Sequence, residues 1–222
     1  MYKKRWALKK GMDFFMIVYL IMAIIAYTIG SINFSIILSK KLAGFDLRQK
    51  GSGNAGTTNM LRTVGKKAAA LTLVCDILKG VVSILIAIII GNIFKSVDNA
   101  VLVQIAGLGV VIGHTFPVFF EFKGGKGVAT AIGLILLINW KIGLICLLVG
   151  ILLIIITKMV SLGSIIAAIL FAILTIFIHN GYIVDGNYFV FGILLGTFVI
   201  YNHRANLKRL LEGKENRINL KK

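Results

Sequence analysis

Long apolar runs separated by short polar loops constrain this sequence more than any other feature. The runs cover residues 14–38, 69–91, 101–119, 127–157, 162–179 and 187–202. A transmembrane helix needs about 20 predominantly apolar residues. A bilayer offers no hydrogen-bond partner to exposed backbone groups, so such runs fold as helices. The sequence therefore predicts an all-α integral membrane protein.

The run 127–157 is interrupted by Asn139, Trp140 and Lys141. One continuous helix would be about 46 Å long and would place Lys141 deep in the membrane, where a charge is costly. Two short helices that turn at Trp140 and Lys141 put the Trp at the membrane interface, where Trp is favoured. With this division we expect about seven transmembrane helices.

The charge distribution fits a membrane protein better than a nucleic-acid-binding protein. Only 15% of the residues are charged and 58% are hydrophobic, whereas about a quarter of the residues in soluble domains are charged. The net charge is +17, but the basic residues cluster between the apolar runs instead of forming a stripe on a soluble surface. We therefore expect the lipid bilayer, and no nucleic acid, as a partner.

The basic residues also predict an orientation. Loops 39–68, 120–127 and 157–161 and the tail 203–222 carry 17 of the 25 Lys and Arg residues, so this side is expected to be cytoplasmic. Seven spans then place the N-terminus outside, although the segment before the first span holds five basic residues. Two explanations stay open: translation starts at Met12 or Met16, or the downstream loops override the N-terminal charge. We expect a basic extension (1–13), one membrane domain (14–203) and a basic cytoplasmic helix and tail (204–222).

The loop 51–59 reads Gly-Ser-Gly-Asn-Ala-Gly-Thr-Thr-Asn and is followed closely by Arg62. Closely spaced glycines let backbone N–H groups converge on an anion, and the Ser, Thr and Asn side chains add donors. Arg62 lies near the start of the next helix and can bind a phosphate through two parallel hydrogen bonds. A flexible polar loop is the alternative, but nine residues with no hydrophobe larger than Ala are unusual beside a membrane.

A second segment contains Gly-His-Thr-Phe-Pro at 113–117 and Phe-Lys-Gly-Gly-Lys-Gly-Val-Ala-Thr at 122–130. Gly-Gly-Lys-Gly directly before a helix places amides, a helix N-terminus and the Lys126 ammonium around one anion. The spacing is not that of a nucleotide-binding P-loop, which would need Ser or Thr at Gly127. The segment therefore predicts a general phosphate site. His114, taken alone, is more typical of a helix end than of a catalyst.

A third segment, 202–215, continues from the last apolar run as a basic helix. His203 and Asn206 are three residues apart and share one helix face at the membrane boundary. A positively charged membrane anchor explains Lys208, Arg209 and Lys214. It does not explain His203 and Asn206, which add no charge at neutral pH.

Two smaller features and one absence complete the pattern. Ser164 lies where the span 162–179 begins on the cytoplasmic side, and Asp76 and Lys79 lie three apart inside a span, where pairing would stabilise them. The His-x-x-x-x-Asp pair of the commoner glycerolipid acyltransferases is missing, because His179 and Asp185 are one residue too far apart. No zinc or paired-Asp magnesium spacing is present, so we expect no metal and no other cofactor.

The three segments, in this order, resemble the bacterial acyl-phosphate glycerol-3-phosphate acyltransferases, the PlsY family. The resemblance covers residues 25–217. Asn33 stands where the family usually has Pro, Ala205 replaces a common Ser, and the basic N-terminal extension is atypical. None of these departures touches the anion-binding residues.

The resemblance implies transfer of an acyl group from acyl phosphate to the 1-hydroxyl of sn-glycerol 3-phosphate. The products would be lysophosphatidate and phosphate, in the first step of phospholipid synthesis at the bacterial cytoplasmic membrane, with the soluble enzyme that makes acyl phosphate as a candidate partner. The family's catalytic positions correspond to Ser52, Arg62, Lys126, Ser164, His203 and Asn206, its phosphate-binding positions to Gly53, Asn54, Thr58, Asn59, Gly124, Gly125 and Gly127, and structural polar positions to Asp76, Lys79 and Glu215.

Two questions stay open. His203 could be a general base or a hydrogen-bond donor that positions a phosphate, and we favour positioning because the activated donor needs no strong base. A transporter of a phosphorylated metabolite is the alternative function. It would show inverted repeats and polar residues throughout the spans, whereas the polar residues here crowd one side.

Overall fold

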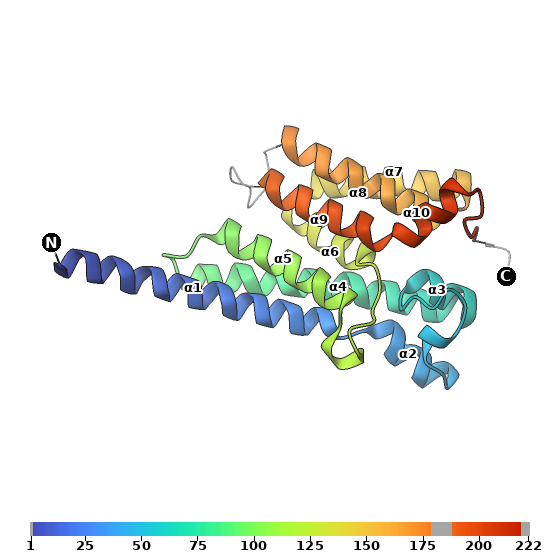
Figure 1. The fold of residues 1–222 in the computed structure, drawn as a ribbon, viewed down its shortest axis with the longest axis horizontal. Helices are drawn as coiled ribbons and strands as arrows, with labels where there is room; N and C mark the ends of the chain where they lie inside the picture. The colour runs from blue at the N-terminus through green and yellow to red at the C-terminus, as the bar shows by residue number, and fades with distance from the viewer. Residues whose placement is uncertain (1, 179–187, 219–222) are drawn as a thin grey trace.

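The computed structural model describes residues 2–178 and 188–218, with side chains from residue 14 onward. Every regular element among these residues is a helix (Figure 1). Their bounds are α1 (Tyr2–Ser31), α2 (Phe34–Ala43), the 3₁₀ helix η1 (Leu47–Gln49), α3 (Thr57–Thr63), α4 (Lys66–Ile93), α5 (Asn99–Thr115), η2 (Val118–Phe120), α6 (Val128–Ile138), α7 (Trp140–Thr157), α8 (Val160–Phe177), α9 (Tyr188–Asn202) and α10 (Arg204–Leu211).

The long helices run side by side, and the short helices α2, α3 and α10 lie at one end of the bundle (Figure 1). α5 packs against α1 and α4, α4 also packs against α6, and α8 packs between α7 and α9. Stretches long and apolar enough to cross a membrane are Phe14–Ala43, Lys66–Ile93, Asn99–Phe120, Trp140–Thr157 and Val160–Phe177, while α6 and α9 are shorter apolar helices. The protein is therefore an all-helical, multi-pass membrane protein.

The first apolar run is not one continuous helix, contrary to the expectation for residues 14–38. α1 ends at Ser31, and α2 begins at Phe34. The side chain of Asn33 caps α2 by accepting a hydrogen bond from the Ile36 amide at 3.2 Å. Asn33 thus starts a new helix inside an apolar run, which hydropathy alone cannot show.

A buried ion pair stabilises this break. The Lys79 ammonium donates to the carbonyl oxygens of Gly30 and Ile32, at 2.9 Å each, and lies 3.2 Å from the Asp76 carboxylate. Carbonyl groups released at a helix end inside a membrane must find another partner. Asp76 and Lys79 therefore pair with each other, as expected, and Lys79 also donates hydrogen bonds to the unpaired carbonyls at the end of α1.

The run 127–157 does form two helices, and the break falls at Asn139. The Asn139 side chain caps α7 by accepting from the Ile142 amide at 3.3 Å. Trp140 is exposed, and the Lys141 ammonium lies 6.0 Å from its ring centroid. The expected division is confirmed, and Lys141 stays at a helix end. His179 and the segment 180–186, which separates the last two apolar runs, lie outside the described residues.

Small residues set how closely the helices approach. A side chain at Gly30 would overlap the Val110 carbonyl, and one at Gly113 would overlap the Tyr27 carbonyl, so α1 and α5 touch backbone to backbone. Close contact through small residues is a typical way to pack helices in a bilayer, where burial of apolar surface does not drive association. This contact fixes the end of α5, from which the second motif loop leaves.

Candidate active site

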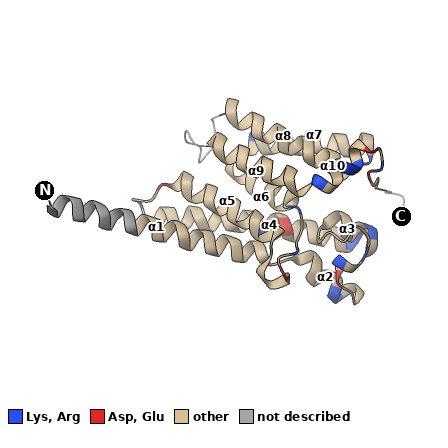
Figure 2. Cartoon of the chain, viewed as in Figure 1, with Lys and Arg blue, Asp and Glu red and all other residues tan. Residues whose placement is uncertain are grey.

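A cavity of about 810 Å³, with many polar and charged residues in its wall, lies at the end of the bundle where most of the charged residues are found (Figure 2). All three motif segments contribute to its wall, although they are separated by up to about 150 residues in the chain. Asp76 and Glu215 also line the cavity, whereas Lys79 is not among the residues of its wall. The predicted residues brought together here are Ser52, Gly53, Asn54, Thr58, Asn59, Arg62, Gly124, Gly125, Lys126, Gly127, Ser164, His203 and Asn206.

Asn59 shapes the first loop from within. Its side-chain oxygen accepts from the Ser52 amide at 2.9 Å, and its Nδ2 donates to the carbonyls of Leu47 (3.2 Å) and Lys50 (2.9 Å). Both donors of the amide are therefore engaged. Asn59 is buried and stabilises the turn that presents Ser52, and it has no free N–H for the phosphate expected from the sequence.

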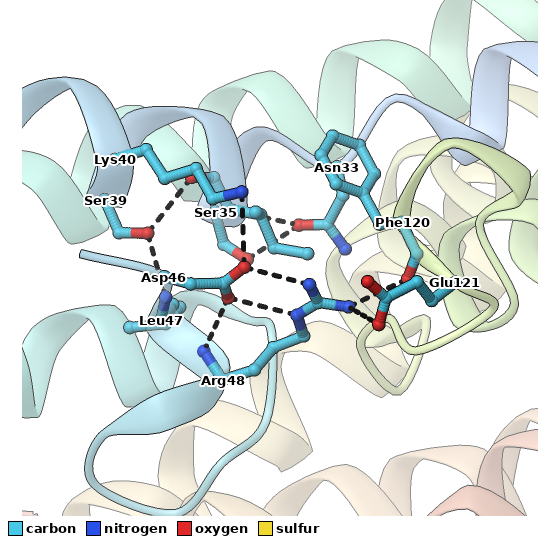
Figure 3. A network of polar contacts seen from close by, with 10 residues as sticks. Asn33, Ser35, Ser39, Lys40, Asp46, Leu47, Arg48, Phe120 and Glu121 are labelled. Atoms are coloured by element: carbon cyan, nitrogen blue, oxygen red, sulfur yellow. Dashed lines mark hydrogen bonds and ion pairs between the residues drawn. The ribbon is translucent and has the colours of Figure 1, made fainter. Parts of the chain in front are cut away.

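A polar network joins this first loop to the second (Figure 3). The Arg48 guanidinium makes two hydrogen bonds to the Asp46 carboxylate, at 3.0 and 2.9 Å, and a third to the Phe120 carbonyl at 2.8 Å. The bonds from Arg48 lower the pKa of Asp46 to about 2, so the pair stays ionised. The loop before Ser52 is thereby anchored to η2, which precedes the glycine-rich loop.

The glycines at 124 and 125 allow close packing instead of offering free amides. The Gly124 amide donates to the Thr115 carbonyl at 3.0 Å, and the Gly125 amide donates to the His114 carbonyl at 3.1 Å. A side chain at Gly125 would overlap the His114 ring. This corrects the expectation that both amides hold phosphate. The pair instead presses the loop against the end of α5 and aims the next residue, Lys126, into the cavity.

Lys126 and the start of α6 place an ammonium and helix N-terminal amides at the end of this loop. Gly127 has a φ of 85° and precedes the first turn of α6, whose amides have no partner within the helix. Burial, together with the neighbouring charges of Arg209 and Arg62 and against the opposing effect of Glu215, lowers the pKa of Lys126 to about 8. An ammonium held in this way gains strongly from a nearby phosphate.

Lys126 begins a chain of contacts that runs through the third segment. Its ammonium donates to Asn206 Oδ1. Asn206 Nδ2 donates to Glu215 at 2.9 Å, and Arg209 Nε donates to the other oxygen of that carboxylate at 3.0 Å. Burial alone would raise the pKa of Glu215, but hydrogen bonds from Asn206 and other neighbours, together with the charge of Arg209, lower it overall. Glu215 therefore stays charged and orients Asn206.

The tautomer of His203 follows from the contact between its ring and a backbone carbonyl. Its Nδ1 lies 2.8 Å from the Val199 carbonyl, which can only accept a hydrogen bond, so Nδ1 carries the proton. Burial, together with the charge of Lys126, lowers the pKa of His203 to about 4. The ring is therefore neutral at pH 7, and Nε2 is a hydrogen-bond acceptor. This nitrogen suits a substrate hydroxyl better than a phosphate oxygen.

An apolar cavity of about 120 Å³ adjoins the polar one between α6, α7, α8 and α9. Both cavities are lined in part by Val128 and Ser164. Its wall includes Cys146 and Phe171. The Phe171 ring packs edge-on against the Phe191 ring, with 6.2 Å between the ring centroids. The combined space thus has a cationic end and an apolar end, with Ser164 between them.

A model of the glycerol-3-phosphate acyltransferase family matches residues 20–213. The chain belongs to the glycerol-3-phosphate acyltransferase family. It is 46% identical over 206 residues to the glycerol-3-phosphate acyltransferase of Clostridioides difficile, covering 92% of this chain and 97% of the relative. It is 44% identical over 199 residues to the glycerol-3-phosphate acyltransferase of Thermoanaerobacter pseudethanolicus, covering 90% of this chain and 95% of the relative.

Solved structures of this family have the same fold. PlsY (YgiH), described as an integral membrane glycerol 3-phosphate acyltransferase in its glycerol 3-phosphate form, matches with a TM-score of 0.79 at 40% identity, covering 90% of this chain and 96% of that one. Its lysophosphatidic acid form matches with a TM-score of 0.76. The resemblance drawn from the three motifs is confirmed, and the comparisons give no support to the transporter alternative.

In this member of the acyltransferase family, two features of the site were not indicated by the sequence pattern. Arg209 was explained as part of a membrane anchor, but its side chain lines the cavity. It follows Asn206 by three residues, so helical spacing could have revealed it. The Asp46–Arg48 pair was also missed. In the sequence it is indicated only by an acidic and a basic residue that lie two apart before a polar loop. Within the described residues, no group of three or more His, Cys, Asp or Glu side chains could hold a metal ion.

Proposed function

We propose that this protein transfers an acyl group from an acyl phosphate to the 1-hydroxyl of glycerol 3-phosphate, releasing phosphate and forming lysophosphatidate. The observation that carries this proposal is the junction of a cationic cavity with an apolar one at Ser164. An acyl phosphate has a phosphate at one end and an alkyl chain at the other, which matches that junction. The names of the related acyltransferases support the acceptor.

The cations make the approach of two phosphates feasible. Two phosphate groups together carry roughly three to four negative charges near neutral pH. Arg62 and Lys126, with the N-terminus of α6, place positive charge in the same cavity. Donors held in position before the reaction stabilise charge that develops in the transition state without further reorganisation. Electrostatic positioning is therefore the main contribution of the protein.

The proposed reaction needs no strong protein base. His203 Nε2 accepts a hydrogen bond from the 1-hydroxyl and aims its oxygen at the acyl carbon. A bond forms between that oxygen and the acyl carbon, the bond from the acyl carbon to the phosphate oxygen breaks, and the hydroxyl proton moves from its hydrogen bond with Nε2 to an oxygen of the departing phosphate. Ser52 would donate a hydrogen bond to a phosphate or acyl oxygen. Ser164 would do so once its hydroxyl turns from the Val160 carbonyl, to which it donates at 2.9 Å. This mechanism agrees with a neutral His203 of low pKa.

The topology belongs to the same proposal. We infer seven spans in the bacterial cytoplasmic membrane, with α6 and α9 as the two short spans, the N-terminus outside, and the site and C-terminus in the cytoplasm. The boundaries proposed from the sequence, 1–13, 14–203 and 204–222, are kept, as is contact with the soluble enzyme that supplies acyl phosphate. Clustering of Lys and Arg at one end supports this orientation (Figure 2).

A cysteine at position 52, in a background without Cys75 and Cys146, should resist labelling from outside intact cells.

A direct assay tests the reaction. Purified protein should release phosphate from palmitoyl phosphate only when glycerol 3-phosphate is added, with no loss of activity in EDTA. Palmitoyl-CoA should not replace palmitoyl phosphate, because the cavity holds donors for a phosphate and the apolar cavity begins directly beside them. Comparable turnover with palmitoyl-CoA would refute the proposed donor while leaving the family assignment intact.

A further inference from the structure

His114 is a buried side chain of the cavity wall that the proposed mechanism does not use. It is the second-last residue of α5 and is only 3% exposed. Among the described residues its Nδ1 makes no hydrogen bond, and this nitrogen lies 3.6 Å from the carboxylate of Asp76. Asp76 is paired with Lys79, which donates to backbone carbonyls at the end of α1. The imidazole therefore rests against a carboxylate whose own position is fixed within the bundle.

The other nitrogen of the His114 ring lies against the glycine-rich loop. A side chain at Gly125 would overlap both His114 Nε2 and the Ala55 carbonyl oxygen. Ala55 belongs to the first motif loop and is fully buried. Gly125 is thus packed tightly between the His114 ring and the first loop, so that α5 and two motif segments meet at this residue.

The position of Gly125 determines where the side chain of Lys126 begins, because the two residues are adjacent. The Gly125 amide donates to the His114 carbonyl at 3.1 Å, so the backbone and the ring of His114 act on the same glycine. From there the Lys126 ammonium reaches Asn206 on α10. A displacement of about 1 Å in a site can lower a rate about a hundredfold, and the residues that support a site prevent such displacements.

We propose that His114 is a positioning residue for Lys126: its ring, held against Asp76, fixes Gly125 and thereby sets how deeply the Lys126 ammonium lies in the cavity. His114 itself touches no substrate. The inference rests on the proposed function only for its effect on the rate, because the placement of Lys126 can be measured without turnover. A ring that only filled space at the end of α5 would affect folding, but it would leave the environment of Lys126 in the folded protein unchanged.

The protonation of Lys126 reports its placement. Burial is the main cause of its low pKa of about 8, so a looser loop that admits water should raise the pH at which the amine loses its proton. The charged and titratable groups that act on Lys126 or respond to its charge are Arg62, His203, Arg209 and Glu215. A substitution of His114 alters none of them, so a shift in this pH indicates a displaced Lys126.

The experiment follows acetylation of Lys126 by acetic anhydride as a function of pH, in the full-length protein in detergent without substrate. Mass spectrometry reads the modification, and the exposed Lys208 is the internal reference for the reagent. Half-maximal reactivity should lie near pH 8 in the wild type. In His114→Ala it should rise by about one pH unit, and kcat/KM at pH 7 should fall roughly tenfold to a hundredfold. His114→Gln, which reaches about as far as Nε2, should lie between. Ile112→Ala, on the exposed face of α5 and outside the cavity wall, should match the wild type.

The midpoint of thermal unfolding in detergent shows which variants fold. An unchanged or lower pH of half-reaction in folded His114→Ala overturns the proposal. If His114→Ala does not fold, Gly125→Ala carries the test, because its methyl group forces the loop away from His114 and Ala55 and should also raise this pH. An unchanged value in that variant refutes the proposal. A protein that shows the shift but releases no phosphate from palmitoyl phosphate and glycerol 3-phosphate would instead refute the proposed reaction, and the positioning of Lys126 by His114 would stand.

Discussion

The ionisation of Lys126 gives the sharpest quantitative prediction for this site. Burial, together with the net effect of nearby charges, lowers its pKa from 10.5 to about 8, a shift that corresponds to roughly 3 kcal/mol against the charged form. Because the lysine pKa is depressed, the positive charge of Lys126 is present below pH 8 and is lost as the pH rises through this value. About nine in ten molecules carry the charge at pH 7, and about one in ten at pH 9.

The assay is the pH dependence of kcat/KM, which reports groups of the free enzyme. Phosphate groups complete their second ionisation near pH 6, so substrate titration does not obscure the range above pH 7. We expect kcat/KM to fall about tenfold per pH unit above 8. The corresponding fall in kcat should occur at higher pH, since a bound phosphate stabilises the ammonium.

Substitution of the lysine tests the assignment of this fall to one side chain. In Lys126→Arg the cation stays charged to much higher pH, so the fall near pH 8 should disappear even though the maximum rate is lower. Lys208→Arg should retain the wild-type profile. The reasoning fails if Lys126→Arg keeps the same fall, or if wild-type kcat/KM is flat to pH 10.

Three further predictions follow from the structure. His203→Gln should retain measurable activity with a raised KM for glycerol 3-phosphate, because its amide oxygen still accepts a hydrogen bond, and His203→Ala should be far worse; equal and complete loss in both folded variants would make His203 a base. Cys146→Phe, which fills the apolar cavity, should lower kcat/KM for palmitoyl phosphate much more than for octanoyl phosphate. Leu148→Phe, on the exposed face of the same helix, should lower neither value. A parallel loss with both donors would show that the acyl chain lies elsewhere. Asp76→Asn should cost roughly 3–5 kcal/mol of stability, seen as a lower midpoint of thermal unfolding in detergent, because the Lys79 charge stays buried without its partner; an unchanged midpoint would contradict a structural role for the pair.

Much of the fold followed from local pattern. Apolar runs near the length of a bilayer identify membrane helices regardless of what they pack against, and the division of 127–157 followed from the cost of burying Lys141. The break after Ser31 did not follow, since its carbonyls are satisfied by Lys79, a residue far along the chain. Hydropathy reports only the composition of a run, whereas a helix break depends on which distant side chain can donate hydrogen bonds to the unpaired backbone carbonyls.

The site shows the same division. The sequence by itself predicted which segments line the site, because glycine spacing, a lysine before a helix and the His203–Asn206 spacing are local features. Only the tertiary structure decided which groups are free to act: contact with the end of α5 engages the amides of Gly124 and Gly125, and Glu215 turns Arg209 toward the cavity. A motif fixes the types of donor, but hydrogen bonds between segments distant in the chain determine which donors remain for a substrate.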